Sequence, residues 1–175
     1  MKRIFLTFAK YNEEANKIIA DILGKLSNED REKNRKSYYG SLSGLYRHVI
    51  GGTCYFLSLF KDAVSDNAEA VKALESLGKV EELKGKLSEA QWKKLVANAK
   101  IVDKARVDFV SALSDKDYEA PVKIDWYEGK PPSAPLWFML EQLTAHNTHH
   151  RGQISHILDT LKIENDYSGI NVKFL

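Results

Sequence analysis

The residues of this chain with the clearest chemical potential are two histidines in the segment 143–153. An α-helix advances by about 100° and 1.5 Å per residue, so His146 and His150 lie on one helical face, about one turn apart. Burying both rings without partners would cost several kcal/mol, whereas one divalent ion would satisfy both. The pair therefore predicts half of a metal site. It continues, without a break, the helical spacing of six apolar residues: Leu136, Leu140, Leu143, Ile154, Ile157 and Leu161.

A third ligand is available on another predicted helix, at residues 41–61. His48 lies outside the histidine-rich helix and takes an apolar position in this one, in line with Leu45, Gly52 and Leu59. We expect it to complete the site. Helical His-x-x-x-His pairs also occur without any metal, and in that alternative the histidines bind nothing.

Small residues surround His48 on its helix. Gly44, Gly51 and Gly52 lie within about 60° of it on the helical wheel. Glycine inside a helix costs about 1 kcal/mol relative to alanine, so three near one histidine predict an open volume beside it. Close packing of another helix is the alternative. Cys54 points about 240° round the helix from His48 and is expected to be a small buried hydrophobic residue outside the site.

Composition and charge exclude several classes of protein. The 175 residues are 43% hydrophobic, which is enough for one domain, residues 1–175, with its own core. The single cysteine excludes an internal disulfide, and the N-terminal residues lack a secretory pattern, so we expect a cytoplasmic protein. No run of about 18 apolar residues predicts a membrane span. Because the 26 basic and 24 acidic residues are spread along the chain, nucleic acid is not an expected partner.

Apolar stripes predict long helices, and we expect an all-α protein, a four-helix bundle with long crossover connections and one short accessory helix. The polar segment 27–37 should be a solvated connection or a loose turn of helix. A capping box formed by Ser88 and Gln91 opens the third long helix, and Ser133 is expected to cap the fourth. The predicted long helices cover residues 5–26, 41–61, 88–113 and the region that begins near 133, and the accessory helix covers residues 67–77.

Periodicity is lost between residues 114 and 135, where four prolines interrupt the chain. Within this segment Val122, Ile124 and Trp126 alternate as a short extended piece would. Its apolar surface suggests a loop that packs on the bundle, and residues 118–132 are expected to close over the site as a lid.

The string His146-x-x-x-His150-Arg151-Gly152-Gln153, the isolated His48 and the segment Tyr11-Asn12-x-x-Ala15-Asn16 together resemble the DinB-like metalloenzymes. This resemblance covers nearly the whole chain, although Glu14 stands where a tryptophan is common in the family. It implies a four-helix bundle, often a homodimer, that binds one divalent ion through three histidines. Matched residue by residue, these ligands would be His48, His146 and His150. Zinc, nickel, iron or manganese are the expected metals, and some relatives are transferases that use low-molecular-weight thiols.

Other polar residues near the predicted site have two interpretations each. Gln153 is expected beside the ligands or in contact with substrate, and Arg151 in a structural salt bridge. His149 and His156 are more often surface residues than ligands. Asn12 interrupts the apolar stripe of the first helix, so it either hydrogen-bonds near the site or pairs with buried backbone.

Three classes of function remain open. Three protein ligands and an open fourth position are the pattern of a catalytic zinc site, which favours a metal-dependent enzyme. A metal-stabilised binding module without turnover and a bundle whose histidines bind nothing are the alternatives. Among enzymes, conjugation of a small thiol co-substrate to an electrophilic small molecule ranks first, because the ion would favour a thiolate. Hydrolysis at the same open position ranks second.

Overall fold

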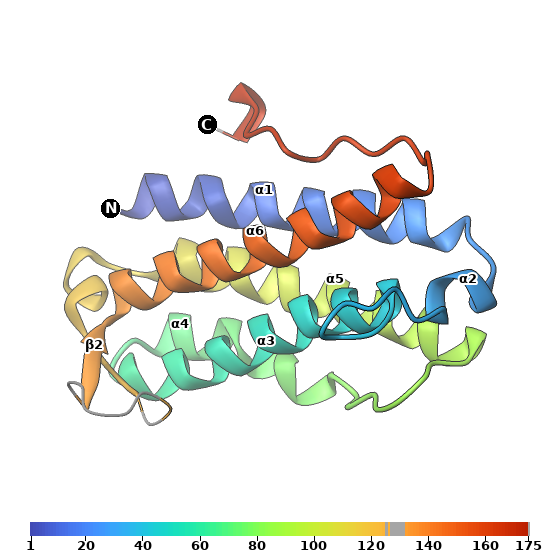
Figure 1. Cartoon of the computed structure of the whole chain (residues 1–175). Coiled ribbons are helices and arrows are strands. Elements are labelled where there is room, and N and C mark those ends of the chain that lie inside the picture. Colours follow the sequence, from blue (N-terminus) through green and yellow to red (C-terminus); the bar gives the residue numbers. More distant parts are fainter. Residues whose placement is uncertain (125, 127–131, 175) are drawn as a thin grey trace.

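Four long helices lie side by side and form a bundle (Figure 1). The computed structural model describes residues 1–124, 126 and 132–174. The prediction of an all-α four-helix bundle is confirmed. None of the helices in these described residues is long and apolar enough to cross a membrane. The long helices are α1 (Lys2–Gly24), α3 (Leu42–Ala63), α5 (Glu89–Ala112) and α6 (Leu136–Thr160).

The directions in which the helices run require one long crossover connection. In Figure 1, α1 and α6 run in one direction and α3 and α5 in the other. The parallel pair is matched end to end, because Tyr46 contacts Trp92 where both helices begin and Phe60 stacks on Phe109 further along. The connection between α3 and α5 must therefore return along the whole bundle. It contains the short helix α4 (Ala68–Ala73) and the 3-10 helix η1 (Glu75–Lys79), where a single accessory helix is predicted.

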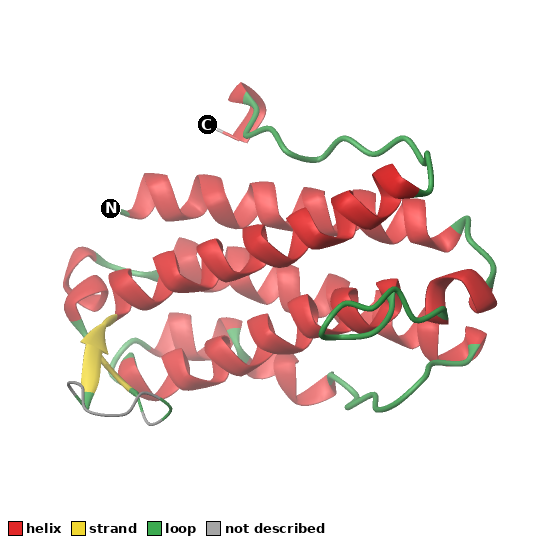
Figure 2. Cartoon of the chain, in the orientation of Figure 1, coloured by secondary structure: helices red, strands yellow, loops and turns green. Residues whose placement is uncertain are grey.

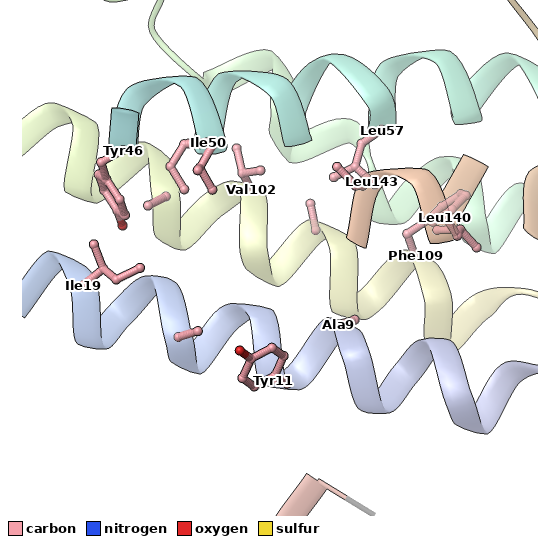
Figure 3. Close-up of a cluster of buried hydrophobic side chains, with 14 of the residues drawn as sticks. Ala9, Tyr11, Ile19, Tyr46, Ile50, Leu57, Val102, Phe109, Leu140 and Leu143 are labelled. Carbon is pink, nitrogen blue, oxygen red and sulfur yellow. The ribbon is translucent and has the colours of Figure 1, made fainter. Parts of the chain in front are cut away.

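Apolar side chains from all four long helices fill the centre of the bundle. Figure 3 shows Ile19 of α1, Ile50 of α3 and Val102 of α5 converging, and all three are at most 1% exposed. The apolar face predicted for α3 is rotated about the helix axis from the face that is buried in the structure. The buried line of α3 includes Val49, Thr53, Leu57 and Phe60, whereas His48, Gly52 and Leu59 are only half-buried. Because α3 is apolar around most of its circumference, its sequence alone permits either face.

A small antiparallel sheet closes one end of the bundle (Figure 2). It follows the 3-10 helix η2 (Asp115–Glu119) and pairs β1 (Pro121–Lys123) with β2 (Ser133–Pro135). The prediction that Ser133 caps the last helix is wrong, because Ser133 lies opposite Lys123 in this sheet. Helix α6 begins after Pro135, and its first free N–H, that of Leu136, donates to the Ala120 carbonyl at 2.9 Å.

Residues 118–132 are predicted to close over the site as a lid. The first of them, Tyr118, does not belong to a lid. Tyr118 is fully buried and stacks on Phe5 of α1, with ring centroids 5.6 Å apart. Residues 125 and 127–131 of the predicted lid lie outside the described residues. Val122 and Ile124 are buried, which agrees with the predicted extended piece.

The polar segment 27–37 is not simply a solvated connection. It contains helix α2 (Asn28–Glu32), and the side chain of Arg31 is only 1% exposed. Its guanidinium donates to two backbone carbonyls at the end of α1, pairs with Glu89 and lies 4.9 Å above the Trp92 ring. Arg31 therefore caps the C-terminus of α1 and ties it to the start of α5.

Beyond α6 the chain folds back over α1 (Figure 1). Tyr11 donates from its hydroxyl to the Tyr167 carbonyl at 2.9 Å, and Phe174, in the 3-10 helix η3 (Val172–Phe174), packs edge-on against the Tyr11 ring. Tyr167 donates in turn to the backbone carbonyl of Arg151 on α6. The C-terminal segment thus joins α1 to α6.

Two glycines of α3 should respond in opposite directions to alanine. A Cβ at Gly44 would lie 2.1 Å from the Tyr39 carbonyl oxygen, whereas a Cβ at Gly51 meets nothing within 4 Å. Gly44→Ala should lower the free energy of unfolding by about 1–3 kcal/mol through overpacking. Gly51→Ala should raise it by up to about 1 kcal/mol through helix propensity. Urea unfolding measures both, and equal stability of the two variants would contradict this packing.

Candidate metal centre

Three histidine side chains converge between α3 and α6. His48 comes from α3, and His146 and His150 come from successive turns of α6. One ring nitrogen of each lies within 4.8 Å of the others, and the Nε2 atoms of His48 and His146 are 2.9 Å apart. Zinc–nitrogen bonds of about 2.0–2.1 Å place tetrahedral ligands roughly 3.3 Å apart. The cluster could therefore hold one divalent ion after small side-chain adjustments.

Side-chain amides hold the outer nitrogens of two of these rings. His150 Nδ1 is 2.8 Å from Gln153 Oε1, and His146 Nδ1 is 3.3 Å from Asn147 Oδ1. The Nε2 of His146 faces His48 in the cluster. Metal-binding histidines are generally oriented by such a contact at their second nitrogen. Gln153 therefore contacts a predicted ligand, which is one of the two roles that its position suggests.

Tyr39 covers one side of the cluster. Its ring stacks on His48 with centroids 3.8 Å apart and an interplanar angle of 18°, and it meets His150 edge-on at 5.3 Å. The sequence analysis missed this residue, because Tyr39 precedes the predicted helix and shows no periodic position. The close approach of Gly44 to the Tyr39 carbonyl fixes the backbone that carries this ring.

An aromatic wall, formed by Tyr55, Phe56 and Trp126, lies beside His146. Phe56 is 6.3 Å from the His146 ring, and Trp126 contacts both Phe56 and Tyr55 at about 6 Å. Tyr55 is 49% exposed and Trp126 is 38% exposed. Large aromatic rings that remain open to solvent beside polar ligands provide apolar surface for a small molecule.

The glycines beside His48 play three different roles. A Cβ at Gly52 would lie 3.1 Å from Cε1 of His146, so this glycine makes room for the imidazole. Gly44 makes room for the Tyr39 backbone, and Gly51 faces open space. The predicted open volume is therefore present next to Gly51, whereas close packing, the alternative interpretation, applies to the other two.

A cavity of about 550 Å³ adjoins His48 and is lined by α3, by residues 80–83 and by the first half of α5. Cys54 contributes to its wall and is only half-buried, so the expectation of a fully buried residue is wrong, but Cys54 does not belong to the group of three histidines, as expected. Burial raises the pKa of the Cys54 thiol, which keeps the thiol protonated at neutral pH. Other residues that line the cavity are Tyr39, Arg47, Gly51, Tyr55 and Glu82.

Behind the histidines lies a cluster of buried polar side chains, most of which the sequence analysis did not assign. Asn12 and Asn16 of α1 donate to the Asp103 carboxylate of α5 at 3.1 and 2.9 Å. Asn147 of α6 donates to Asn12 and to Thr53 of α3. Burial raises the pKa of Asp103 to about 7, although the hydrogen bond from Asn16 opposes this. Asp103 was missed because α5 packs against α1, α3 and α4 and so has a wide buried face.

Three more polar residues of α6 were singled out from the sequence. Arg151 is buried, donates to the Asn12 amide oxygen and lies over the Tyr11 ring, and no described carboxylate forms the predicted salt bridge with it. His149 is exposed and accepts from Gln153 at 3.3 Å. His156 is also exposed, and neither histidine belongs to the group of three described histidines that could hold a metal ion.

Each of the three clustered histidines has a lowered pKa. Burial is the main cause, and repulsion from the neighbouring imidazoles adds to it at His48, whose pKa falls to about 4. Burial also lowers the pKa of His146 and of His150, although the contacts with Asn147 and Gln153 oppose this. The cluster therefore stays neutral at physiological pH, as metal ligation by imidazole requires.

Alanine substitutions should separate ligands from neighbours. His48→Ala, His146→Ala and His150→Ala should each abolish tight binding of one divalent ion per chain, because each removes one of three converging nitrogens. His149→Ala and His156→Ala should retain the ion. Metal analysis of the untagged variants tests this, and full retention by His48→Ala would remove that residue from the ligand set.

Acid should destabilise the metal-free protein through His48. Its pKa of about 4 in the folded state is below the ordinary value of 6.5, so the unfolded chain binds more protons between these values. The free energy of unfolding should therefore fall as the pH is lowered from 6.5 towards 4.

The matched variants are His48→Ala, which should lose less stability over this range, and His149→Ala, which should behave as the wild type. Urea unfolding at several pH values measures the effect. The same acid dependence in His48→Ala and in the wild type would contradict the assignment.

The sequence profile of the DinB family matches residues 1–161, which include all four long helices and the three clustered histidines. No curated protein and no solved structure matches the chain. The family match agrees with the resemblance carried by the histidine string and with the observed bundle. The chain belongs to the DinB family.

Proposed function

We propose that this protein binds one divalent metal ion through His48, His146 and His150 and activates a small thiol for transfer to an electrophilic molecule. The observation that carries the proposal is the cluster of three imidazoles from two helices beside a cavity of about 550 Å³. Three protein ligands with a free fourth position are typical of catalytic zinc sites, whereas structural zinc sites have four.

In the proposed reaction, the metal ion would act through its positive charge. A divalent ion held by neutral imidazoles keeps its +2 charge and lowers the pKa of a thiol or of water at its fourth position. Imidazole ligands suit zinc, nickel and iron. The chain's own thiol is a poor candidate for the nucleophile, since burial raises the pKa of Cys54. The reacting thiol is therefore proposed to come from solution.

The surroundings of the cluster supply a charged and an apolar surface for two substrates, and the two surfaces adjoin at Tyr55, which belongs to both. Arg47 and Glu82 line the cavity that adjoins His48, and they offer opposite charges to the polar groups of a small thiol. The aromatic wall on the His146 side offers apolar surface to the electrophile. This arrangement favours an electrophile with an apolar or aromatic portion.

Hydrolysis is the second candidate, because water can take the same fourth position. It would require a base near the ion to deprotonate or orient that water. No described Asp or Glu belongs to the histidine cluster, and Asp103 is separated from His146 by Asn12 and Asn147. Glu82 lines the adjoining cavity but lies outside the histidine group, so we rank thiol transfer above hydrolysis. A metal-binding module without turnover is the third candidate.

The wider biological setting also belongs to the proposal. We propose a cytoplasmic location, which the single cysteine supports, and a homodimer, which the family resemblance implies. The substrates are proposed to be small molecules, because the cavity beside His48 has the size of a small-molecule site.

Metal-loaded protein should consume a small thiol and an electrophile together. The test incubates it with several low-molecular-weight thiols and a panel of aromatic and aliphatic electrophiles, and follows both thiol loss and product formation. His150→Ala, which lacks one ligand, should lower the rate at least about 100-fold, as expected when a catalytic metal is lost. Exposed His156→Ala should retain the activity.

Each other outcome points to a different function. Product formation without thiol consumption would establish metal-dependent hydrolysis in place of transfer. Inactivity in both assays, with the metal still bound, would favour the binding module.

A further inference from the structure

The metal site requires one particular tautomer of His146. A neutral imidazole carries one hydrogen, and only the nitrogen without it can bind a metal ion. Free neutral histidine prefers to carry the hydrogen on Nε2, and Nε2 is the atom of His146 that faces His48 at 2.9 Å. Some contact within the protein must therefore reverse the ordinary preference.

The contact at the other nitrogen is made by Asn147. His146 Nδ1 lies 3.3 Å from Asn147 Oδ1, and an amide oxygen accepts but never donates. If this amide is held in its observed orientation, the hydrogen of His146 must be on Nδ1. The orientation of the Asn147 amide therefore decides the tautomer.

Thr53 holds the amide of Asn147 from α3. The Thr53 hydroxyl donates its hydrogen to the Val49 carbonyl at 2.8 Å, so its oxygen can only accept from a second partner. That partner is Asn147 Nδ2, at 2.9 Å. An exchange of the amide oxygen and nitrogen would place two acceptors against each other.

Asn12 and Arg151 hold the same amide from α1 and α6. Asn147 Nδ2 also donates to Asn12 Oδ1 at 3.1 Å, and Arg151 donates to that same oxygen. A guanidinium has no acceptor, so Arg151 fixes Asn12 with its oxygen towards Asn147. Asn12 Nδ2 then points to the Asp103 carboxylate, at 3.1 Å. Each atom in this series of hydrogen bonds can therefore act only as the donor or only as the acceptor that the structure shows.

Burial makes this arrangement expensive to reverse. Asn147 and Thr53 are 0% exposed, Asn12 is 2% exposed and Arg151 is 3% exposed. Water is therefore not available to replace a lost hydrogen bond among these four residues, and an unsatisfied buried donor or acceptor costs about 1–3 kcal/mol. The contact of Asn147 with His146 is itself only part-buried, so the buried bonds of Asn147 to Thr53 and Asn12 are what fix its direction.

We propose that Asn147 is a positioning residue that places the hydrogen of His146 on Nδ1 and so prepares Nε2 for the metal. The direction of its hydrogen bond is imposed by Thr53 and by Arg151 acting through Asn12. In the metal-free protein, the hydrogen between His48 and His146 then belongs to His48 Nε2. This inference rests on the proposed metal site, but the tautomer itself exists without metal.

The side-chain amide of Gln153, which contacts His150 on α6, can be compared with that of Asn147. Gln153 makes the equivalent contact with His150 Nδ1, but it is only half-buried and its nitrogen contacts the exposed His149. Water can replace Gln153 at this surface. Gln153→Leu should therefore weaken metal binding much less than Asn147→Leu.

The first test is histidine nitrogen NMR on the metal-free wild type, at a pH about one unit above the ordinary histidine pKa. Proton–nitrogen couplings distinguish the two neutral tautomers of each ring. His146 should carry its hydrogen on Nδ1 and His48 on Nε2. A hydrogen on Nε2 of His146 would overturn the proposal, whatever the variants do.

The second test compares two buried asparagines. Asn147→Leu should move the hydrogen of His146 to Nε2, at least in part, and weaken zinc binding by about 10- to 100-fold. Asn16→Leu removes an equally buried amide that donates to Asp103, and it should leave both readouts unchanged. Asn147→Asp keeps an oxygen towards His146 and should keep the Nδ1 hydrogen, but its second oxygen would face the Thr53 and Asn12 oxygens, so this variant should also be less stable than the wild type.

Equal losses of zinc affinity in Asn147→Leu and Asn16→Leu would show a merely structural role and overturn the proposal. If Asn147→Leu does not fold, the wild-type tautomer still decides. An Nδ1 hydrogen in a wild type that binds no zinc would support the tautomer assignment and contradict the proposed function.

Discussion

Every polar group buried between the four long helices needs a partner, and this requirement organises the interior of the molecule. Asn147 lies where the helices meet, with bonds to Asn12 of α1 and Thr53 of α3. Asp103 of α5 receives the donors of Asn12 and Asn16. A shift of any one helix would break hydrogen bonds made by the others. These directional bonds therefore restrict the relative positions of the helices in addition to the surrounding apolar contacts.

One buried charged group in this interior lacks a full set of partners in the described part of the chain. Arg106 is buried and donates to Thr144 at 2.8 Å, but its Nε and Nη1 have no hydrogen-bond partner among the described residues. Burial lowers the pKa of Arg106 to about 10, and repulsion from Arg151 adds to this. Both guanidinium groups attract the Asp103 carboxylate and oppose the rise in its pKa that burial causes. The two arginines thus favour an ionised acceptor for the asparagines.

Apolar periodicity predicted the helices of the bundle correctly. It did not predict which residues are buried where that depends on the packing of other helices. The long helices lie close to their predicted ranges, and the Ser88–Gln91 capping box is present. On α3, however, apolar residues occupy most of the circumference, so the buried face depends on where α5 and α6 lie. Arg31 looked solvated from its neighbours in sequence, yet it is buried because the end of α1 offers carbonyls and Trp92 offers a ring.

The sequence by itself determined which residues share a helical face, because a period of 3.6 residues is a property of one helix. That sufficed to single out His48, His146 and His150 and to expect that they meet. The tertiary structure decided what lies opposite each face. Tyr39 over His48, the aromatic wall beside His146 and the bonds that join Asn147 to Thr53 all connect residues distant in the chain. Their positions depend on how the helices pack, and no local spacing carries that information.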